Sequence, residues 1–265
     1  MNVTARLLTT LMLVSLSHQS FAMSADADTA SRHAVLVPKS GTYSRAISTD
    51  VALAQTYFDQ GLRLAWGFYF PESIASYQEA SRLDPSHPMP YWGIAHAAGP
   101  NPNSRYAQMP DDPQGAGLAA IEAALDRIDR ATPMEAALIK ALYVFYDAKS
   151  IPDPRERDRA YLAEMRELNK QYPDDPDVAA LYAGSFMSIR RWDYWDKSGE
   201  AKGETLAVAE ALEHVINTGD PHPGVYHLHI HLIEASLEPE RAMVSADALE
   251  ATLPIGGHVV HMPAH

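Results

Sequence analysis

The chain has 265 residues, of which 46% are apolar, so it can bury a sizeable core and is not expected to be disordered. Its formal net charge of -13 argues against nucleic acid as the main partner, because phosphate binding needs clustered Lys and Arg. The chain has no cysteine, so disulfides and thiolate metal sites are excluded, and any metal must be held by histidine, carboxylate or amide groups.

The N-terminus has the pattern of a secretory signal peptide. Met1–Arg6 is weakly positive, Leu7–Ser17 is apolar, and Ser20–Ala22 fits a small-x-small cleavage site. A membrane anchor is the alternative, but the apolar run is well short of the roughly 20 residues that span a bilayer. We therefore expect residues 1–22 to be removed, leaving a periplasmic or secreted protein with no membrane span.

Residues 23–50 are polar and rich in Ala, Ser, Asp and Thr, which is typical of a flexible leader. Helical patterning starts near Val51 and continues to the end of the sequence, so residues 51–265 are expected to form one helical domain. The sequence ends at His265 inside an expected helix, with no capping helix after it. Because helical arrays usually need an end cap, we expect the sequence to be truncated at its C-terminus.

The first part of this domain matches a tetratricopeptide repeat, a 34-residue unit of two antiparallel helices. Gly61 is the small residue expected where the two helices cross, and Tyr77 and Ala80 have the offsets of the second helix. Pro85 follows at the expected helix end, while Ser73 stands where a smaller residue is usual.

A second repeat beginning at Tyr91 is interrupted by a long loop over residues 97–115, rich in Pro, Asn, Gly and Asp. No later segment alternates with the period of a strand. The fold class predicted is therefore all-α, with antiparallel helix pairs stacked as a right-handed solenoid that has a concave face. The further helices are expected at 117–130, 133–147, 155–171, 177–188, 205–217, 224–236, 239–252 and from Gly256 onward.

Seven of the twelve histidines fall within residues 222–265. In the helix expected over 224–236, the pattern H-x3-H-x2-E places His227, His231 and Glu234 on one stripe. The apolar residues occupy much of the opposite side, and His229 falls among them, so we expect His229 to be a core residue.

The last segment repeats this arrangement as H-x2-H-x3-H. His258, His261 and His265 share one face if the segment is helical, although Pro263 can kink or restart the helix. Two neighbouring helices that each present three ligands can build a metal site between them. The cofactor predicted is one or two transition metal ions, zinc, copper or iron, because six candidates exceed the needs of one tetrahedral zinc. Some of them could instead orient the ligands. The alternative is a buried, pH-responsive histidine network without metal.

Other polar and aromatic residues receive mainly structural interpretations. His222 lies between two prolines and is expected to start a helix, while His87 and His96 are expected to be structural. Asn101 and Asn103 could line a site if their loop folds over it. We expect the side chains of Trp192, Tyr194 and Trp195 to pack between helices. The less expected alternative is that they form an aromatic wall of the site.

The segments "HPGVYHLHIHLIEAS", "PERAM" and "GGHVVHMPAH" resemble a group of bacterial tetratricopeptide-repeat proteins with the signature HPG…HxxxHxxEAS…PERA…GHxxHMPxH. The resemblance covers nearly all of residues 51–265 and implies a helical array that continues with further repeats. It implies no reaction. The matching residues are His222, His227, His231, Glu234, His258, His261 and His265.

Two functions follow from these patterns. The first is a metal-binding repeat protein, including the case of a metalloenzyme in which Glu234 is a ligand or a general base. The second is a protein-interaction scaffold that binds a peptide in its concave groove, with the histidines as a structural network; fold analogy alone supports it.

Overall fold

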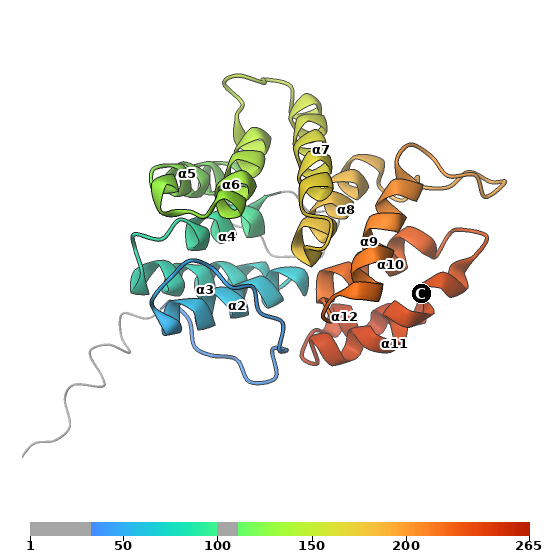
Figure 1. Ribbon diagram of the computed structural model, residues 1–265, viewed down its shortest axis with the longest axis horizontal. Coiled ribbons are helices and arrows are strands. Elements are labelled where there is room, and N and C mark those ends of the chain that lie inside the picture. Colours follow the sequence, from blue (N-terminus) through green and yellow to red (C-terminus); the bar gives the residue numbers. More distant parts are fainter. Residues whose placement is uncertain (1–32, 100–110) are drawn as a thin grey trace, which may run out of the picture. The chain divides into compact units, whose positions relative to one another are not determined.

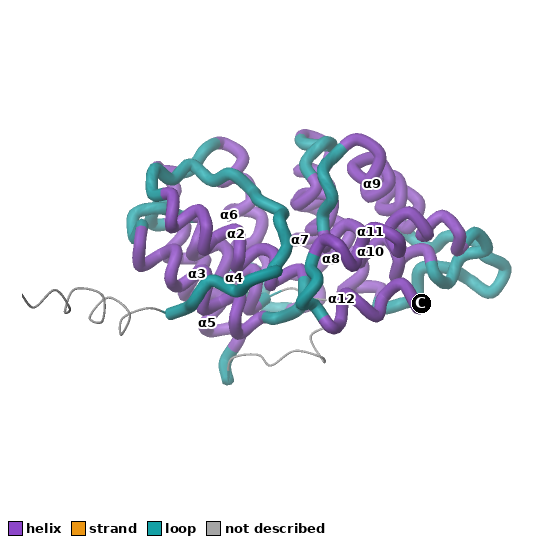
Figure 2. The backbone as a smooth tube through the Cα atoms, turned by 90° about the horizontal axis from the view of Figure 1, so that it is seen from below, coloured by secondary structure: helices purple, strands orange, loops and turns teal. Residues whose placement is uncertain are grey.

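The computed structural model describes residues 33–99 and 111–265. These residues are mainly helical, and their only β-type pairing is an isolated bridge between Trp195 and Ala201, which confirms the all-α prediction (Figures 1 and 2). No helix in this part of the chain is long and apolar enough to cross a membrane. The expected signal peptide, Asn101 and Asn103 lie outside the described residues.

The helices follow the expected order, but several of their bounds differ. The segment expected as one helix over 117–130 forms a helix over Pro113–Leu125, which begins inside the loop expected over 97–115, and a 3-10 turn over Ile128–Arg130. The segment expected as one helix over 239–252 begins with a 3-10 turn, η3, and the helix expected over 224–236 ends earlier, at Ile233. The described α-helices are α2 (Ala52–Trp66), α3 (Phe70–Leu83), α4 (Met89–Ala98), α5 (Pro113–Leu125), α6 (Pro133–Tyr146), α7 (Pro154–Gln171), α8 (Pro176–Arg190), α9 (Thr205–Thr218), α10 (Pro223–Ile233), α11 (Met243–Thr252) and α12 (Gly257–His261); the 3-10 turns are η2 (Ile128–Arg130), η3 (Pro239–Ala242) and η4 (Met262–Ala264).

Five of these helices start with the same kind of N-terminal cap. The residue before each helix accepts a hydrogen bond from a backbone N–H of the first turn, and a proline follows it. Such a cap satisfies a donor that has no partner within the helix, and proline is tolerated there because its own N–H is not needed. The capping residues are Asp112, Thr132, Asp153, Asp175 and His222.

Helices that are consecutive in the sequence pack against one another from α2 to α11. In α2, α3 and α4 the fully buried ring of Tyr77 fills the space beside two glycines. A Cβ added at Gly61 or Gly93 would lie 2.8 or 2.4 Å from that ring, so these close helix contacts need glycine. This packing explains why the repeat pattern in the sequence places a small residue opposite an aromatic one.

Helix α10 is buried along its whole length and packs against α2, α8, α9 and α11. The α12 and η4 segments pack against α11, and η4 also contacts α10 (Figure 1). Side chains on every face of α10 therefore enter the interior, including the face that carries its histidines.

Residues 33–50, within the segment expected to be a flexible leader, contain no helix or strand but run along α2. Gln60 of α2 accepts a hydrogen bond from the N–H of Val37 at 2.7 Å and donates to the carbonyl of Val35 at 2.9 Å. Asp59 of α2 accepts from the N–H of Arg45 at 3.0 Å. The described part of this segment is thus fastened to the helical domain by side chains of α2.

Candidate metal centre

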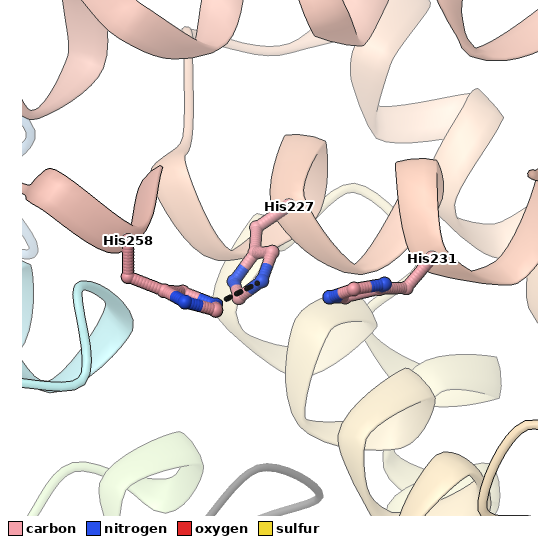
Figure 3. Close-up of side chains that lie close together, drawn as sticks. All are labelled: His227, His231 and His258. Carbon is pink, nitrogen blue, oxygen red and sulfur yellow. Dashed lines mark hydrogen bonds between the residues drawn. The ribbon is translucent and has the colours of Figure 1, made fainter. Parts of the chain in front are cut away.

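Five histidines from two segments form a closed ring of imidazoles. Helix α10 contributes two of them, and the α12–η4 segment contributes the other three (Figure 3 shows His227, His231 and His258). Around the ring, successive centroids are separated by 4.8 Å (His258–His227), 5.0 Å (His227–His231), 5.2 Å (His231–His265), 5.3 Å (His265–His261) and 4.9 Å (His261–His258).

The distances between ring nitrogens suit metal coordination. Nε2 of His258 and Nε2 of His227 are 3.1 Å apart, and Nε2 of His265 and Nε2 of His261 are 3.4 Å apart. Two nitrogen ligands of one tetrahedral zinc ion, each 2.0–2.1 Å from the metal, are about 3.3 Å from each other. Two sets of three residues have ligand atoms that all lie within 4.8 Å: His227, His231 and His258, and His231, Glu234 and His265.

Glu234 follows α10 and holds the orientation of two of the rings. Its carboxylate lies 3.2 Å from Nδ1 of His231 and 2.8 Å from Nδ1 of His265. Burial by itself raises the pKa of Glu234, but the hydrogen bonds and charges of His231 and His265 outweigh burial and lower it. An ionised carboxylate only accepts hydrogen bonds, so both rings donate through Nδ1, and in the neutral imidazoles Nε2 keeps its lone pair.

One of these lone pairs has no partner inside the protein. His231 is 6% exposed, and its Nε2 is buried without any hydrogen bond. A buried polar atom without a partner is costly, and such atoms are rare in folded proteins. This atom therefore fits a nitrogen ligand for a metal ion. The four other imidazoles of the ring, and Glu234, which orients two of the rings, fit the same purpose.

Two histidines of the ring are held in the neutral form. Burial lowers the pKa of His227 well below its ordinary value, and the positive charges of the neighbouring histidines lower it further. The same two causes lower the pKa of His258 to about 4. Neutral imidazole is the form that coordinates a metal, so these rings need to lose no proton at neutral pH.

Two aromatic residues with unusual backbone conformations touch the ring. Phe68 has φ 63° and Trp192 has φ 68°, which is the left-handed region that bulky residues rarely adopt. The Phe68 ring lies 4.9 Å from that of His227 and 5.0 Å from that of His258, and Trp192 lies 5.8 Å from His231. Such conformations cost about 1–3 kcal/mol each and tend to occur at functional sites.

The other histidines singled out in the sequence lie outside the ring. His229 is fully buried, as expected, with its Nδ1 2.9 Å from Ser245 Oγ. The imidazole of His87 is 2.9 Å from Ser48 Oγ and accepts a hydrogen bond from the N–H of Met89. Both have the structural contacts expected of them.

Of the three aromatic residues near the loop after α8, only Trp192 contacts the histidine ring. Tyr194 is 1% exposed and packs near Phe186, and Trp195 donates a hydrogen bond to the carbonyl of Leu232 at 2.7 Å. The expectation of helix packing therefore holds for Tyr194 and Trp195, whereas Trp192 covers the site.

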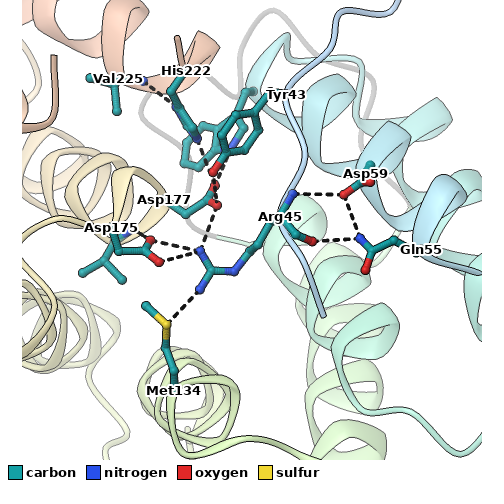
Figure 4. A network of polar contacts seen from close by, with 11 residues as sticks. Tyr43, Arg45, Gln55, Asp59, Met134, Asp175, Asp177, His222 and Val225 are labelled. Carbon is teal, nitrogen blue, oxygen red and sulfur yellow. Dashed lines mark hydrogen bonds and ion pairs between the residues drawn. The ribbon is translucent and has the colours of Figure 1, made fainter. Parts of the chain in front are cut away.

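A second polar cluster, the Asp177 hub, lies at the start of α10 (Figure 4). The carboxylate of Asp177 is fully buried and accepts hydrogen bonds from the hydroxyl of Tyr43 at 2.7 Å, from Arg45 at 3.0 Å and from the indole of Trp66 at 3.1 Å. Nε2 of His222 lies 3.0 Å from it. His222 thus joins the cap of α10 to a carboxylate of α8.

The groups around Asp177 keep its carboxylate ionised. Burial by itself raises the pKa of Asp177, but the charge and hydrogen bond of His222, together with Arg45 and Tyr43, lower it strongly. Burial and the proximity of Asp177 raise the pKa of Tyr43, so its hydroxyl stays a donor. Arg45 also pairs with Asp175 at 2.9 Å. The hub fixes where α10, and with it His227 and His231, meets α8 and residues 33–50.

Sequence reasoning missed Phe68 and the Asp177 hub. Phe68 follows α2 in the stretch "WGFYF", and nothing local marks it as a neighbour of histidines far along the chain. The sequence pattern places Asp177 at a helix start, and the Asp-rich stretch "DDPD" around that start is the one local signal for a buried carboxylate cluster. No model of a known protein family matches the chain, and searches of curated proteins and of solved structures gave no match.

Proposed function

We propose that this protein is a metal-binding helical-repeat protein that holds one or two transition metal ions in its histidine ring. One observation carries the proposal: Nε2 of His231 is buried without a partner among four other imidazoles. The proposed ligands are the imidazoles of His227, His231, His258, His261 and His265, with Glu234 as the carboxylate that orients two of them.

The imidazole nitrogens of the ring limit which metal ions can bind, and these metals share a Lewis-acid chemistry. Imidazole suits zinc, copper and iron, and the lack of cysteine disfavours soft thiolate centres. When bound with an open position, such a metal supplies a Lewis acid and lowers the pKa of a coordinated water. In a metalloenzyme of this kind, His227 and His258 are ready to bind without losing a proton, and Phe68 and Trp192 keep water away from two sides.

The proposal includes the architecture and location expected from the sequence. The contact of Gly61 with Tyr77 between α2 and α3 supports a tetratricopeptide-type repeat, and the pairwise packing of consecutive helices supports a solenoid. The match of the histidines to the signature of the bacterial repeat family supports membership in that family. The signal-peptide pattern of residues 1–22 supports export.

The metal content of the purified protein tests the proposal. We would measure it by elemental mass spectrometry for the wild type and for His227→Ala/His231→Ala, each before and after reconstitution with zinc, copper or iron. His214→Ala is the matched control, since His214 pairs with Asp174 on the surface, away from the ring. The expected result is one or two equivalents of metal in wild type and control, lost in the double variant.

The proposal is overturned if the wild type takes up no metal from any of the three solutions, or if the double variant keeps the full equivalents. A wild type without metal would leave the alternative of a structural histidine network in an interaction scaffold.

A further inference from the structure

A small pocket adjoins the histidine ring on the side of Phe68. It lies between α2, α3, α4, α7, α8 and α10 and holds a free volume of about 30 Å³. Most of its lining is aromatic or aliphatic, and His227 forms part of its wall. The two pocket walls nearest the ring are therefore His227, a proposed metal ligand, and Phe68, whose left-handed backbone places its ring against His227.

A glycine inside a helix faces this pocket without a packing reason. Gly184 lies in the middle of α8, and a Cβ added there would meet only Leu228 Cδ1, at an ordinary contact distance of 3.9 Å. By contrast, a Cβ at Gly61, Gly93 or Gly117 would lie 2.1–2.8 Å from a tyrosine side chain. Glycine weakens a helix relative to alanine, so a glycine at position 184 needs a reason, and packing does not supply it. A ligand that occupies the space in front of Gly184 would explain why no side chain stands there.

One residue that lines the pocket carries a buried polar atom without a hydrogen-bond partner. His96 is 7% exposed, stacks on Trp92 with an interplanar angle of 6°, and lines the pocket, while its Nδ1 is buried without a hydrogen bond. Burial lowers the pKa of His96 to about 4, so the ring is neutral at pH 7. The unpartnered nitrogen of this neutral imidazole offers one hydrogen bond to a ligand and no charge.

These features define the class of molecule that fits. The free volume accepts two or three heavy atoms, given that one water needs about 10–15 Å³ by the same measure. No Lys, Arg, Asp or Glu lines the pocket, and an unpaired charge is expensive to bury. The lining thus favours a small uncharged group, mainly apolar, with one hydrogen-bonding atom.

We propose that this pocket binds a small uncharged molecule, such as a short-chain alcohol, with its polar atom on Nδ1 of His96 and its apolar part over Gly184. Binding in the pocket stands independently of a metal. Its role as the substrate side of the centre, reached past His227, rests on the proposed function.

The test uses ethanol as the probe, with formate and ethylammonium as charged molecules of three heavy atoms. Methyl NMR signals of Leu181 and Leu228, which line the pocket, report occupancy in the metal-free and in the zinc-reconstituted full chain. We expect a saturable shift with ethanol and none with the two ions. Gly184→Ala fills the space without a clash, so it should abolish the ethanol shift, raise the melting temperature and keep the metal content.

Two further variants separate the contributions. His96→Leu removes the unpartnered nitrogen at similar volume and should weaken ethanol binding about five-fold, the value of one net hydrogen bond. Ile189→Ala, at an exposed position of the same helix, should bind ethanol like the wild type.

The proposal is overturned if ethanol gives no saturable shift, if formate or ethylammonium binds as well as ethanol, or if Gly184→Ala binds ethanol unchanged. The failures are distinguishable, because the metal content is measured on the same samples. A protein that binds metal but not ethanol refutes the pocket alone, and one that binds ethanol but not metal refutes the proposed function and the substrate role.

Discussion

The Asp177 hub and the histidine ring are both polar clusters that meet at α10, but they differ in how their groups are paired. In the hub, the buried carboxylate of Asp177 is surrounded by Tyr43, Arg45, Trp66 and His222, each within hydrogen-bond distance (Figure 4). In the ring, like groups face each other, and Nε2 of His231 has no partner (Figure 3).

We infer from this difference that the hub is a structural cluster and that the ring is the candidate binding site. In the hub, positively charged groups and hydrogen-bond donors satisfy the carboxylate of Asp177. The hub can therefore hold α8, α10 and residues 33–50 in a fixed arrangement. A metal ion would complete the ring in the way that Arg45 and His222 complete the hub.

The largest expected effect comes from breaking the hub. Asp177→Ala leaves the buried Arg45 without one of its carboxylates and His222 without its acceptor, so we expect a loss of about 3–5 kcal/mol in the free energy of unfolding. Urea unfolding at pH 7 measures it. Asp174→Ala, at a neighbouring position 82% exposed, is the control and should change little. A loss no greater than that of the control would contradict a structural hub.

A second effect comes from pH and His96, whose ring touches Trp66 of the hub. Its folded pKa of about 4 lies below the ordinary value of 6.5, so between these values the unfolded chain binds a proton that the folded protein does not. Stability is therefore full above pH 6.5 and falls as the pH drops toward 4, by up to about 3 kcal/mol from this residue.

Urea unfolding of wild type and His96→Leu at pH 7 and pH 4.5 isolates this contribution. Other buried histidines titrate in both proteins, so the comparison uses the difference between the two pH slopes. The variant should show the smaller loss of stability on acidification, and equal slopes would refute a buried neutral His96.

A third effect is the stabilisation of the ring by metal. At a free zinc concentration 100 times the dissociation constant, binding should add about 2.7 kcal/mol to the free energy of unfolding. His231→Leu should lose this increment. In the metal-free protein it should cost only about 1.5–3 kcal/mol, from the Nδ1 hydrogen bond to Glu234, because its Nε2 has no hydrogen bond to lose. Thermal unfolding with zinc and with chelator measures both, and a larger cost in the chelated protein would mean that the ring is already satisfied.

The smallest expected effect is a change in tryptophan fluorescence, which reports where the metal binds. Trp192 lies 5.8 Å from His231, so copper(II) bound in the ring should quench its fluorescence. Titration of wild type and Trp192→Phe compares the quenched fraction, which should fall in the variant, while Trp195→Phe serves as the matched control. Equal quenching in wild type and Trp192→Phe would place the copper elsewhere.

Much of the local structure could be predicted from the sequence. The helices expected over 155–171 and 177–188 are α7 and α8, and the helical spacing of His227, His231 and Glu234 predicted that they share one stripe of α10 and its C-terminal end, because helix periodicity is a local property. The kink expected at Pro263 occurs as the change from α12 to the 3-10 turn η4.

Only the tertiary structure decided which groups meet. His258 reaches His227 across 31 residues, and Tyr43 reaches Asp177 across 134. The left-handed Phe68 between the ring and the pocket, and the empty space at Gly184, follow from how α2, α8 and α10 cross. Periodicity fixes the direction of a side chain on its own helix, but the neighbour it finds depends on the packing of the whole core, which no local pattern encodes.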